Sequence, residues 1–330
     1  MDFDNSSIRK IGVLTSGGDA PGMNAALRAV VRATIFYGKQ AAGIYRGYQG
    51  LMEGDFMDMD ARSVANIIQR GGTILKSARS VEFTTEEGRK KAAAQLQQHG
   101  IDALVVIGGD GTFRGASVFM EETKIPIIGI PGTIDNDLPY TDFTIGYDTA
   151  CNTVIHAVDA IRDTAVSHNR LFFIEVMGRD SGFIALRAGL AAGVETIVIP
   201  EQAFSYENLL RKLARNERTK SSSALVIVAE GNKWGNAAQL AEKITTQFPA
   251  YDTRVTVLGH VQRGGTPSCL DREIASRMGV VAVEAILMGK SDMMVGIINN
   301  RSVLTPFKEV VKTRQPVNIE LMRINEILSV

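Results

Sequence analysis

Short runs of β-branched and other apolar residues recur along this chain, and nearly every run ends in glycine, proline or a polar cluster. The runs cover residues 11–15, 103–109, 125–132, 171–178, 196–200, 224–231 and 254–259. They are apolar throughout rather than alternating, which is typical of parallel strands buried on both faces. Segments with helical spacing of apolar residues follow them, as from Met23 to Tyr37. Strand, turn and helix repeated in this order predict an α/β fold of doubly wound, mostly parallel type.

The length of the chain allows one large domain or two ordinary ones. Its 330 residues, 45% of them hydrophobic, are enough for two separate cores. The segment LPYTDFTIG, residues 138–146, breaks the rhythm of strand and helix, so we expect a domain boundary near it. In open α/β sheets, ligands bind at the carboxyl ends of the strands. The polar turns that follow the strands are therefore where we expect the chemistry.

The charge and the cysteine content argue against a nucleic-acid binder and against a disulfide-stabilised or zinc-binding protein. Lys+Arg and Asp+Glu number 36 each, and a chain without net charge lacks the positive field of a nucleic-acid binder. Cys151 and Cys269 have no C-x-x-C spacing, which argues against a disulfide framework or a zinc site and fits a reducing cytosol. The first ten residues, MDFDNSSIRK, lack the apolar core of a signal peptide. No apolar run approaches the roughly 20 residues that span a bilayer, so we expect a cytoplasmic protein.

Two glycine-rich turns follow predicted strands. In LTSGGDAPGMNAALR, residues 14–28, Gly17 and Gly18 allow close backbone approach, and the start of the next helix favours an anion. The segment lacks the Gly-Lys-Ser/Thr ending of a P-loop, and an ordinary strand-to-helix turn explains it equally well. In VVIGGDGTFRGA, residues 105–116, Asp110 and Thr112 are the functional groups among glycines. A carboxylate beside an anion site suits Mg²⁺, although Asp110 could also serve only as a helix cap.

A third turn, GIPGTIDND at residues 129–137, concentrates acidic groups after an apolar run. A carboxylate such as Asp135 can accept the proton of a sugar hydroxyl as its oxygen attacks. Asp137 can hold or orient water around a metal, and Thr133 can contact a phosphoryl group in transfer. Phosphoryl transfer needs mainly positioning and charge neutralisation. The alternative is an Asx-rich loop whose side chains satisfy only their own backbone.

Cationic side chains flank the ends of several predicted strands. Arginine binds phosphate in a bidentate manner, whereas a lone surface arginine more often forms an ion pair. Several such arginines in a chain of zero net charge favour a collected phosphate site. Glu230, at the end of a strand, is a candidate acceptor for substrate hydroxyls. The candidate cations are Arg79, Arg170, Arg179, Arg254, His260 and Arg263.

Together these segments resemble the bacterial ATP-dependent 6-phosphofructokinases. TSGGDAPGMNAALR, GGDGT, PGTIDND, EVMGR and LGHVQRGGTPS occur in that family's order and spacing, and the similarity runs over nearly the whole chain. GGDGT alone is weak, because lipid and NAD kinases share it, but the joint set is specific. The resemblance implies a Mg²⁺-dependent transfer of the ATP γ-phosphate to the 1-hydroxyl of fructose 6-phosphate.

The resemblance also implies roles for individual residues. Asp135 matches the general base and Asp110 the magnesium-associated carboxylate, with Asp137 a second candidate for the metal. Thr133 and Arg179 match groups that stabilise the moving phosphoryl group. The nucleotide contacts match Gly18, Arg79, Ser80, Gly109, Asp110, Gly111, Thr112 and Gly115. The substrate contacts match Thr133, Ile134, Asp135, Arg170, Met177, Gly178, Arg179, Glu230, Arg254, His260, Val261, Gln262 and Arg263.

The same resemblance implies an architecture. It implies a nucleotide-binding domain of residues 1–143 with about 259–312, and a sugar-phosphate-binding domain of residues 144–258 with about 313–330. The active site is expected between them. In the family, Arg170 and Arg254 would come from the neighbouring subunit of a homotetramer. We therefore expect self-association in addition to binding of ATP and fructose 6-phosphate.

Two departures bear on substrate and regulation. A pyrophosphate-using branch of the family typically has an acidic residue where Gly111 stands and lysine where Gly132 stands, so the two glycines favour ATP, with pyrophosphate as the alternative donor. The family's effector site is matched at Arg28, Arg32, Arg162 and Glu195. However, Ala61 stands where the family usually has an arginine, and Asn66 stands where it usually has an aspartate. Residues 221–223 are all serine, in a segment that is usually basic in the family. Fewer cations predict weak or absent regulation by phosphoenolpyruvate and ADP.

Overall fold

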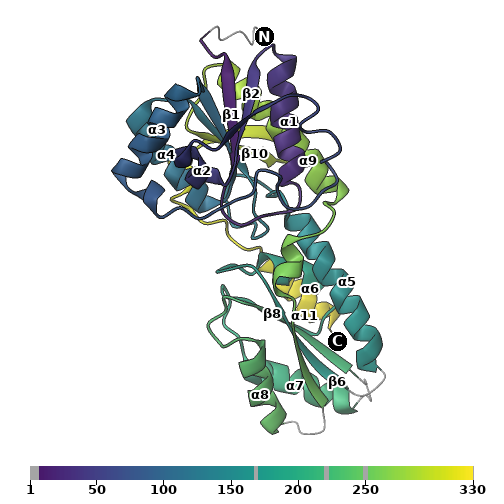
Figure 1. The fold of residues 1–330 in the computed structure, drawn as a ribbon. Helices are drawn as coiled ribbons and strands as arrows, with labels where there is room; N and C mark the ends of the chain where they lie inside the picture. The colour runs from purple at the N-terminus through teal and green to yellow at the C-terminus, as the bar shows by residue number, and fades with distance from the viewer. Residues whose placement is uncertain (1–6, 167–169, 219–222, 248–251, 330) are drawn as a thin grey trace. The chain divides into compact units, whose positions relative to one another are not determined.

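The computed structural model describes residues 7–166, 170–218, 223–247 and 252–329 (Figure 1). The chain forms two compact units. Unit 1 comprises Met1–Thr133, Leu138–Thr149 and Arg263–Gln315, and unit 2 comprises Ile134–Asp137, Ala150–Gln262 and Pro316–Val330. Each unit is therefore assembled from segments that are distant in the sequence.

Unit 1 is built on a seven-stranded sheet of order β11-β10-β5-β4-β1-β2-β3. Strands β1, β2, β4, β5 and β10 run parallel, whereas β3 and β11 pair antiparallel at the two edges. The chain order reverses between β1 and β4, which makes their carboxyl ends the topological switch point. The strands are β1 Lys10–Thr15, β2 Gln40–Ile44, β3 Phe56–Met59, β4 Ala103–Gly108, β5 Ile127–Pro131, β10 Met293–Ile298 and β11 Arg301–Pro306.

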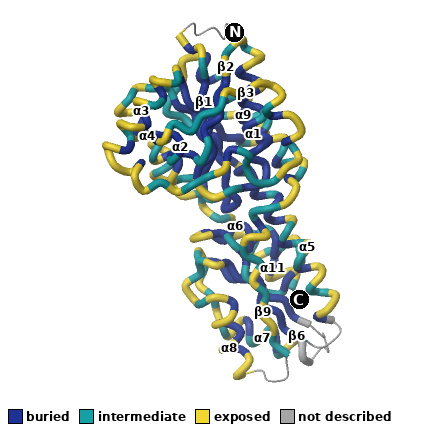
Figure 2. Tube along the Cα trace, in the orientation of Figure 1, coloured by how far each residue is buried: buried dark blue, intermediate teal, exposed yellow. Residues whose placement is uncertain are grey.

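Helices cover both faces of this sheet (Figure 1). One face carries α2 Gly47–Glu53, η1 Glu82–Thr84, α3 Glu86–Gln98, α4 Asp110–Thr123 and α10 Phe307–Val310, and the other carries α1 Met23–Phe36 and α9 Cys269–Leu287. The buried core lies between the layers (Figure 2), with Phe113 and Phe307 stacked at 5.1 Å. Helices α1 and α9 pack closely because position 279 is glycine; a Cβ there would lie 2.5 Å from Ala29.

Unit 2 has a four-stranded parallel sheet of order β7-β8-β6-β9. Alternate residues of β6 and β8, such as Leu171 and Val226, pack with α7 and α8 in one buried cluster. Helix α5 begins in unit 1 and continues into unit 2. The elements are α5 Tyr147–Val166, β6 Arg170–Val176, α6 Phe183–Ala191, β7 Thr196–Val198, α7 Tyr206–Arg218, β8 Ser223–Ala229, α8 Ala237–Gln247, β9 Asp252–Val257, η2 Gly259–Arg263 and α11 Glu320–Leu328.

The predicted α/β class is confirmed, and every apolar run named from the sequence overlaps a strand. The expectation that these strands are buried on both faces is wrong for β9. It lies at a sheet edge, and Val255 and Val257 are 40% and 61% exposed. Strands β2, β3, β10 and β11 were not predicted. Among the described residues, no helix is long and apolar enough to cross a bilayer.

Candidate active site

Three predicted turns of unit 1 meet at the carboxyl ends of β1, β4 and β5, which are neighbours in the sheet. The amide of Ser16 donates to the carbonyl of Ile107 (2.9 Å), and the amide of Gly132 donates to the carbonyl of Gly108 (3.0 Å). A Cβ at Gly109 would lie 3.8 Å from the Cβ of Thr133. The structure thus brings the two Gly-Gly-Asp turns and Thr133 together at the switch point.

Two glycines of the second turn have different roles: Gly108 allows the turns to pack closely, and Gly111 leaves open space beside the turn. A Cβ at Gly108 would lie 2.5 Å from the carbonyl oxygen of Ser16 and 2.4 Å from the hydroxyl of Thr112, so a side chain there would force the turns apart. A Cβ at Gly111 would meet nothing within 4 Å. Gly111 is exposed, and its surface is therefore accessible to a ligand.

Asp110 is the first residue of α4, where the helix dipole favours a negative charge. Its carboxylate pairs with the guanidinium of Arg114 one turn later, at 3.0 Å, in a pair whose arginine is 63% exposed. No group of three or more His, Cys, Asp or Glu side chains suited to a metal occurs among the described residues. Mg²⁺ takes one or two carboxylates together with phosphate oxygens and water. Asp110 therefore fits a magnesium ion that arrives with a phosphorylated ligand.

Arg263 lies against the first glycine-rich turn. Its guanidinium donates to the carbonyl of Asp19 at 3.2 Å. A Cβ added to Gly18 would lie 2.5 Å from a guanidinium nitrogen of Arg263. The guanidinium of Arg263 can lie against the turn because position 18 has no side chain. The predicted residues Gly18 and Arg263 therefore meet within unit 1.

Three further predicted nucleotide contacts, Ser80, Thr112 and Gly115, lie beside an aromatic pair, Tyr48 and Phe83. The sequence analysis did not identify this pair. Tyr48 and Phe83 stack at 3.9 Å, and a Cβ at Gly115 would lie 3.3 Å from each ring. The Tyr48 hydroxyl donates to the carbonyl of Thr112 at 2.7 Å, and its burial raises the pKa of the phenol. Ser80 accepts a bond from the Phe83 amide at 3.2 Å, while Arg79 is exposed. Gly115 therefore admits the aromatic pair against α4.

In unit 2 the carboxyl ends of β8, β6 and β9 bring a second set of predicted residues together. One carboxylate oxygen of Glu230 accepts bonds from the amides of Arg179 (2.7 Å) and Gly178 (3.3 Å). The side-chain oxygen of Gln262 accepts a bond from the amide of Met177 at 3.2 Å, and its nitrogen donates to the carbonyl of Gly259 at 2.9 Å. Gln262 is fully buried. Glu230 and Gln262 thus shape the turn of residues 177–179.

This turn has an unusual backbone. Arg179 adopts a left-handed conformation with φ of 55°, and Gly178 has φ of 149°. A Cβ at Gly231 would lie 1.8 Å from the carbonyl oxygen of Arg179, so only glycine fits there. The arrangement leaves the Arg179 side chain exposed to solvent. His260 and Val261 are exposed in η2, beside Gln262 in the sequence.

Asp135 belongs to unit 2 and is attached to the same turn. Ser181 donates from its hydroxyl to the carbonyl of Asp135 at 3.1 Å and to that of Gly178 at 2.9 Å. Asp135 is 8% exposed, Ile134 is fully buried, and Asp137 is half-buried. Thr133, two residues earlier, belongs to unit 1, and its carbonyl accepts a bond from the Thr144 hydroxyl at 2.6 Å. Two residues span at most about 7 Å, so the chain itself keeps Thr133 near Asp135.

Arg170 and Arg254 lie apart from this set. They share the carboxylate of Asp252, at 3.2 Å and 2.9 Å respectively, at the amino ends of β6 and β9. Arg170 lies seven residues before Met177 on β6, and Arg254 pairs with Phe172, five residues before it. At about 3.3 Å per residue, these spacings correspond to roughly 23 and 17 Å. Within one chain, the structure therefore does not bring these two arginines to the other predicted sugar-phosphate contacts.

The predicted effector residues are divided between the units. Arg28 and Arg32 lie one turn apart on α1, and the pKa of Arg28 is lowered by burial and by the charge of Arg32. In unit 2, Arg162 donates to the carbonyl of Gly193 at 3.0 Å. Glu195 accepts a bond from the Leu225 amide at 2.6 Å, and burial raises the pKa of its carboxyl group. The serines at 221 and 222 lie outside the described residues, and Ser223 begins β8.

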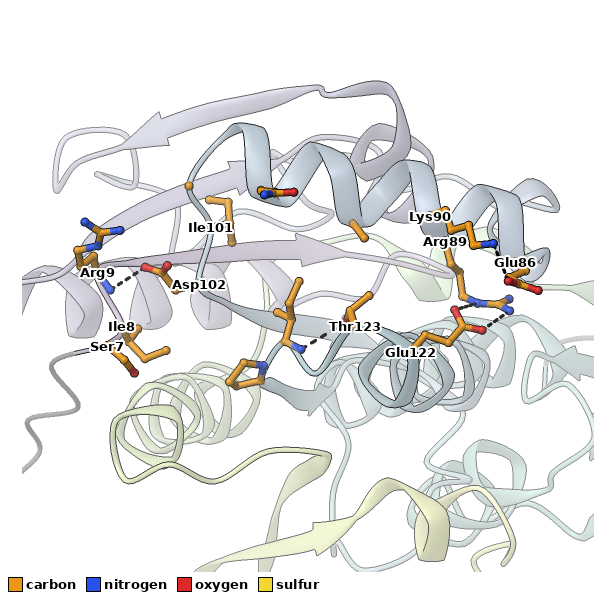
Figure 3. Close-up of a pocket in the computed structure, with 15 residues that line it drawn as sticks. Ser7, Ile8, Arg9, Glu86, Arg89, Lys90, Ile101, Asp102, Glu122 and Thr123 are labelled. Carbon is orange, nitrogen blue, oxygen red and sulfur yellow. Dashed lines mark hydrogen bonds and ion pairs between the residues drawn. The ribbon is translucent and has the colours of Figure 1, made fainter.

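A separate groove of about 910 Å³ lies at the amino ends of β1, β4 and β5, between α3 and α4 (Figure 3). None of the predicted site residues lines it. Four of its charged side chains form two ion pairs, Arg89 with Glu122 at 2.7 Å and Lys90 with Glu86 at 2.7 Å. The groove is therefore at the opposite end of the strands from the turns described above.

Glycine-rich and cation-bearing turns at the carboxyl ends of doubly wound sheets define an α/β protein built to bind phosphorylated ligands. The profile of the family described as Phosphofructokinase matches residues 10–286. The chain belongs to the phosphofructokinase family.

Relatives support this membership over the whole length. An "ATP-dependent 6-phosphofructokinase 2" of Bacteroides thetaiotaomicron is 51% identical over 324 residues, covering 98% of this chain and 99% of the relative. An "ATP-dependent 6-phosphofructokinase 1" of Thermus thermophilus is 54% identical over 322 residues, covering 98% of this chain and 100% of the relative.

Solved structures share the fold. Phosphofructokinase from Saccharomyces cerevisiae superimposes with a TM-score of 0.86 at 40% identity, over 92% of this chain. This chain spans 45% of the yeast chain, less than half its length. A pyrophosphate-dependent phosphofructokinase from Marinobacter aquaeolei gives a TM-score of 0.83 at 24% identity, covering 95% of this chain and 86% of that one, and shows the fold alone.

Proposed function

We propose that this protein is an ATP-dependent 6-phosphofructokinase. It transfers the γ-phosphate of ATP to the 1-hydroxyl of fructose 6-phosphate, giving fructose 1,6-bisphosphate and ADP, the committed step of glycolysis. The names of relatives that match along almost all of the chain support this reaction. The observation that carries the proposal is the placement of Asp135. The residue is largely buried, its loop is attached to the Met177–Arg179 turn, and it lies two residues after Thr133 of the glycine-rich site.

Asp135 acts as the general base that accepts the proton of the attacking hydroxyl. Thr133 and Arg179 stabilise the phosphoryl group in transfer, because this reaction depends on charge neutralisation more than on covalent chemistry. Unit 1 binds the nucleotide through the turns around Gly18 and Gly109. Unit 2 binds the sugar phosphate through the turn that Glu230 organises. Glu230 keeps its second oxygen for a sugar hydroxyl, since the bonds from the two backbone amides use only one.

Mg²⁺ is the proposed cofactor, and ATP is the co-substrate. Asp110 would hold the ion together with phosphate oxygens, and Asp137 is the second candidate. The ion would neutralise charge on the phosphates of the nucleotide. Asp110 can release Arg114 at small cost, because exposed ion pairs contribute no more than about 1 kcal/mol.

Packing around two glycines supports ATP over pyrophosphate as donor. The open space at Gly111 leaves room for the larger nucleotide. At Gly132, a Cβ would lie 3.0 Å from Ile107 and 3.1 Å from Met23, so a lysine would crowd the core. The second candidate, a pyrophosphate-dependent enzyme, would need a lysine at position 132, where the structure has little room for one.

A homotetramer in the cytoplasm is the proposed working form. Arg170 and Arg254 lie at the far end of their own sheet from Met177. They can complete a sugar-phosphate site most directly by serving a neighbouring copy. Weak or absent regulation by phosphoenolpyruvate and ADP follows from the replaced cations at positions such as Ala61. Arg162 and Glu195 also already bond to the backbone of unit 2.

The deciding experiment compares initial rates with fructose 6-phosphate and Mg²⁺, using ATP in one sample and pyrophosphate in another. We expect activity with ATP only. The variant Asp135→Ser should bind both substrates nearly normally and lose at least about 10²-fold in turnover, as expected for a lost general base. Asp159→Ser, the same change at an exposed position of α5, is the matched control. Wild-type turnover in Asp135→Ser would contradict the assigned role, and activity with pyrophosphate would contradict the assigned donor.

A further inference from the structure

The loop that carries Arg79 and Ser80 has little regular structure of its own. Residues 60–81, all of them described, contain neither helix nor strand between β3 and η1. Lys76 within it adopts a left-handed conformation with φ of 58°. A loop of this length keeps a fixed shape only if other parts of the molecule hold its backbone.

Asn24 on α1 holds the first part of this loop. Its side-chain nitrogen donates to the carbonyls of Arg70 (3.1 Å) and Gly71 (3.2 Å), and its side-chain oxygen accepts a bond from the amide of Ile74 (2.8 Å). Asn24 is 1% exposed. One buried amide thus makes three bonds to the backbone of a single turn.

Thr15, at the end of β1, holds the second part. Its hydroxyl donates to the carbonyl of Lys76 at 2.8 Å and lies 2.9 Å from the hydroxyl of Thr73. Thr15 is fully buried. Because β1 is a central strand of the sheet, the hydroxyl is a fixed reference point for the loop.

The stretch that bears the functional residues is short and anchored at both ends. Lys76 is bound by Thr15, and Ser80 accepts a bond from the amide of Phe83 at 3.2 Å. Only residues 77–79 lie between these anchors. Packing adds a further limit, because a Cβ at Gly71 would lie 2.3 Å from the carbonyl oxygen of Gly265, two residues after Arg263. With three residues between the anchors, the position of Lys76 therefore restricts where Arg79 can lie.

We propose that Thr15 and Asn24 are positioning residues for nucleotide binding, which fix the loop so that Arg79 and Ser80 can contact the nucleotide. This inference rests on the proposed function, because it takes the nucleotide role of Arg79 and Ser80 from it. Neither residue needs to touch the ligand. Their effect is on affinity for the nucleotide, through the shape of the loop.

The test uses Thr15→Val, which keeps the shape of the side chain and removes its hydroxyl. Thr34→Val is the matched control, because the Thr34 hydroxyl is equally buried and bonds only to the carbonyl of Val30 in its own helix, at 2.8 Å. We expect Thr15→Val to raise KM for ATP about five- to tenfold, the effect of roughly one hydrogen bond. The values of kcat and of KM for fructose 6-phosphate should stay within about twofold. Calorimetric titration with ATP, without sugar, should show the same loss of affinity.

Asn24→Ala supplies a second measurement and should raise KM for ATP at least as much as Thr15→Val. If Asn24→Ala does not fold, the Thr15→Val and Thr34→Val pair still decides the question. Equal KM for ATP in that pair would overturn the inference, as would a parallel loss of kcat without weaker ATP binding. A wild-type protein inactive with ATP and fructose 6-phosphate would instead refute the proposed function.

Discussion

Asp271 makes several buried polar contacts in unit 1, and the sequence analysis did not single it out. It is fully buried, and its carboxylate accepts bonds from the amides of Gly146 and Thr149, both at 2.8 Å, and from the hydroxyl of Thr149. Its own amide donates to the hydroxyl of Ser268 at 3.2 Å, which caps α9. One side chain thus joins the start of α9 to the start of α5. We expect its removal to destabilise unit 1 strongly.

The magnitude follows from the groups left behind. Asp271→Ala leaves two amides and the Thr149 hydroxyl without this acceptor and also removes a longer bond from the Ser268 hydroxyl, at 3.4 Å. Each buried unsatisfied group costs roughly 1–3 kcal/mol. Burial disfavours the charged form of the Asp271 carboxyl group and raises its pKa. Removing that charge offsets part of the loss. We therefore expect the free energy of unfolding to fall by about 3–5 kcal/mol.

The assay must report on unit 1. The single tryptophan, Trp234, belongs to unit 2, so its fluorescence is a poor probe. Urea unfolding followed by circular dichroism gives the loss of stability, and hydrogen exchange of the amides of Gly146 and Thr149 localises it. Ser276→Ala is the control, because that hydroxyl bonds only to the carbonyl of Arg272 in its own helix, at 2.7 Å. The reasoning is refuted if Asp271→Ala loses no more stability than Ser276→Ala and the two amides keep their protection.

Three further outcomes are expected. Gly18→Ala should displace the Arg263 guanidinium, which lies 2.5 Å from the added Cβ. It should raise KM for fructose 6-phosphate about tenfold or more, the effect of losing a charge-assisted contact, with an unchanged melting temperature; steady-state kinetics and calorimetry measure the two. Gly132→Lys should lower stability by about 1–3 kcal/mol through overpacking and gain no pyrophosphate activity, which thermal melting and rate assays would check. Millimolar phosphoenolpyruvate should leave half-saturation by fructose 6-phosphate within about twofold, and a strongly shifted sigmoidal curve would contradict this.

The fold was predictable where the sequence carries a strong local pattern. β4, with the sequence ALVVIG, is fully buried, and its unbroken apolar run correctly predicted a strand. β2, with the sequence QAAGI, has no such run and becomes a strand because it pairs with β1. β3, FMDM, is a half-exposed edge strand. β10, MMVGII, is apolar, and a search for unbroken runs could have found it.

The site was predictable at its turns and not in its supports. The glycines around Gly18 and Gly109 are visible because glycine is rarely clustered without a backbone reason. Asp271 and Gly146 are 125 positions apart, and Asn24 and Gly71 are 47 positions apart. A local sequence pattern cannot predict contacts between residues so distant in the chain. Thr15 and Asn24 lie inside a quoted motif, yet their role became visible only once the loop they hold was placed.

Three charged residues of the proposed site, Asp110, Arg170 and Arg254, are held in ion pairs at least partly exposed to solvent. Asp110 pairs with Arg114, and Arg170 and Arg254 share Asp252, whose side chain is 40% exposed. Exposed pairs of this kind contribute about 0–1 kcal/mol each, whereas charge-assisted bonds to a phosphate are stronger. A phosphorylated ligand or its metal can therefore redirect these groups at little cost. Glu230 and Gln262, by contrast, accept bonds from backbone amides, so the turn that presents Arg179 is held by bonds that do not depend on these ion pairs.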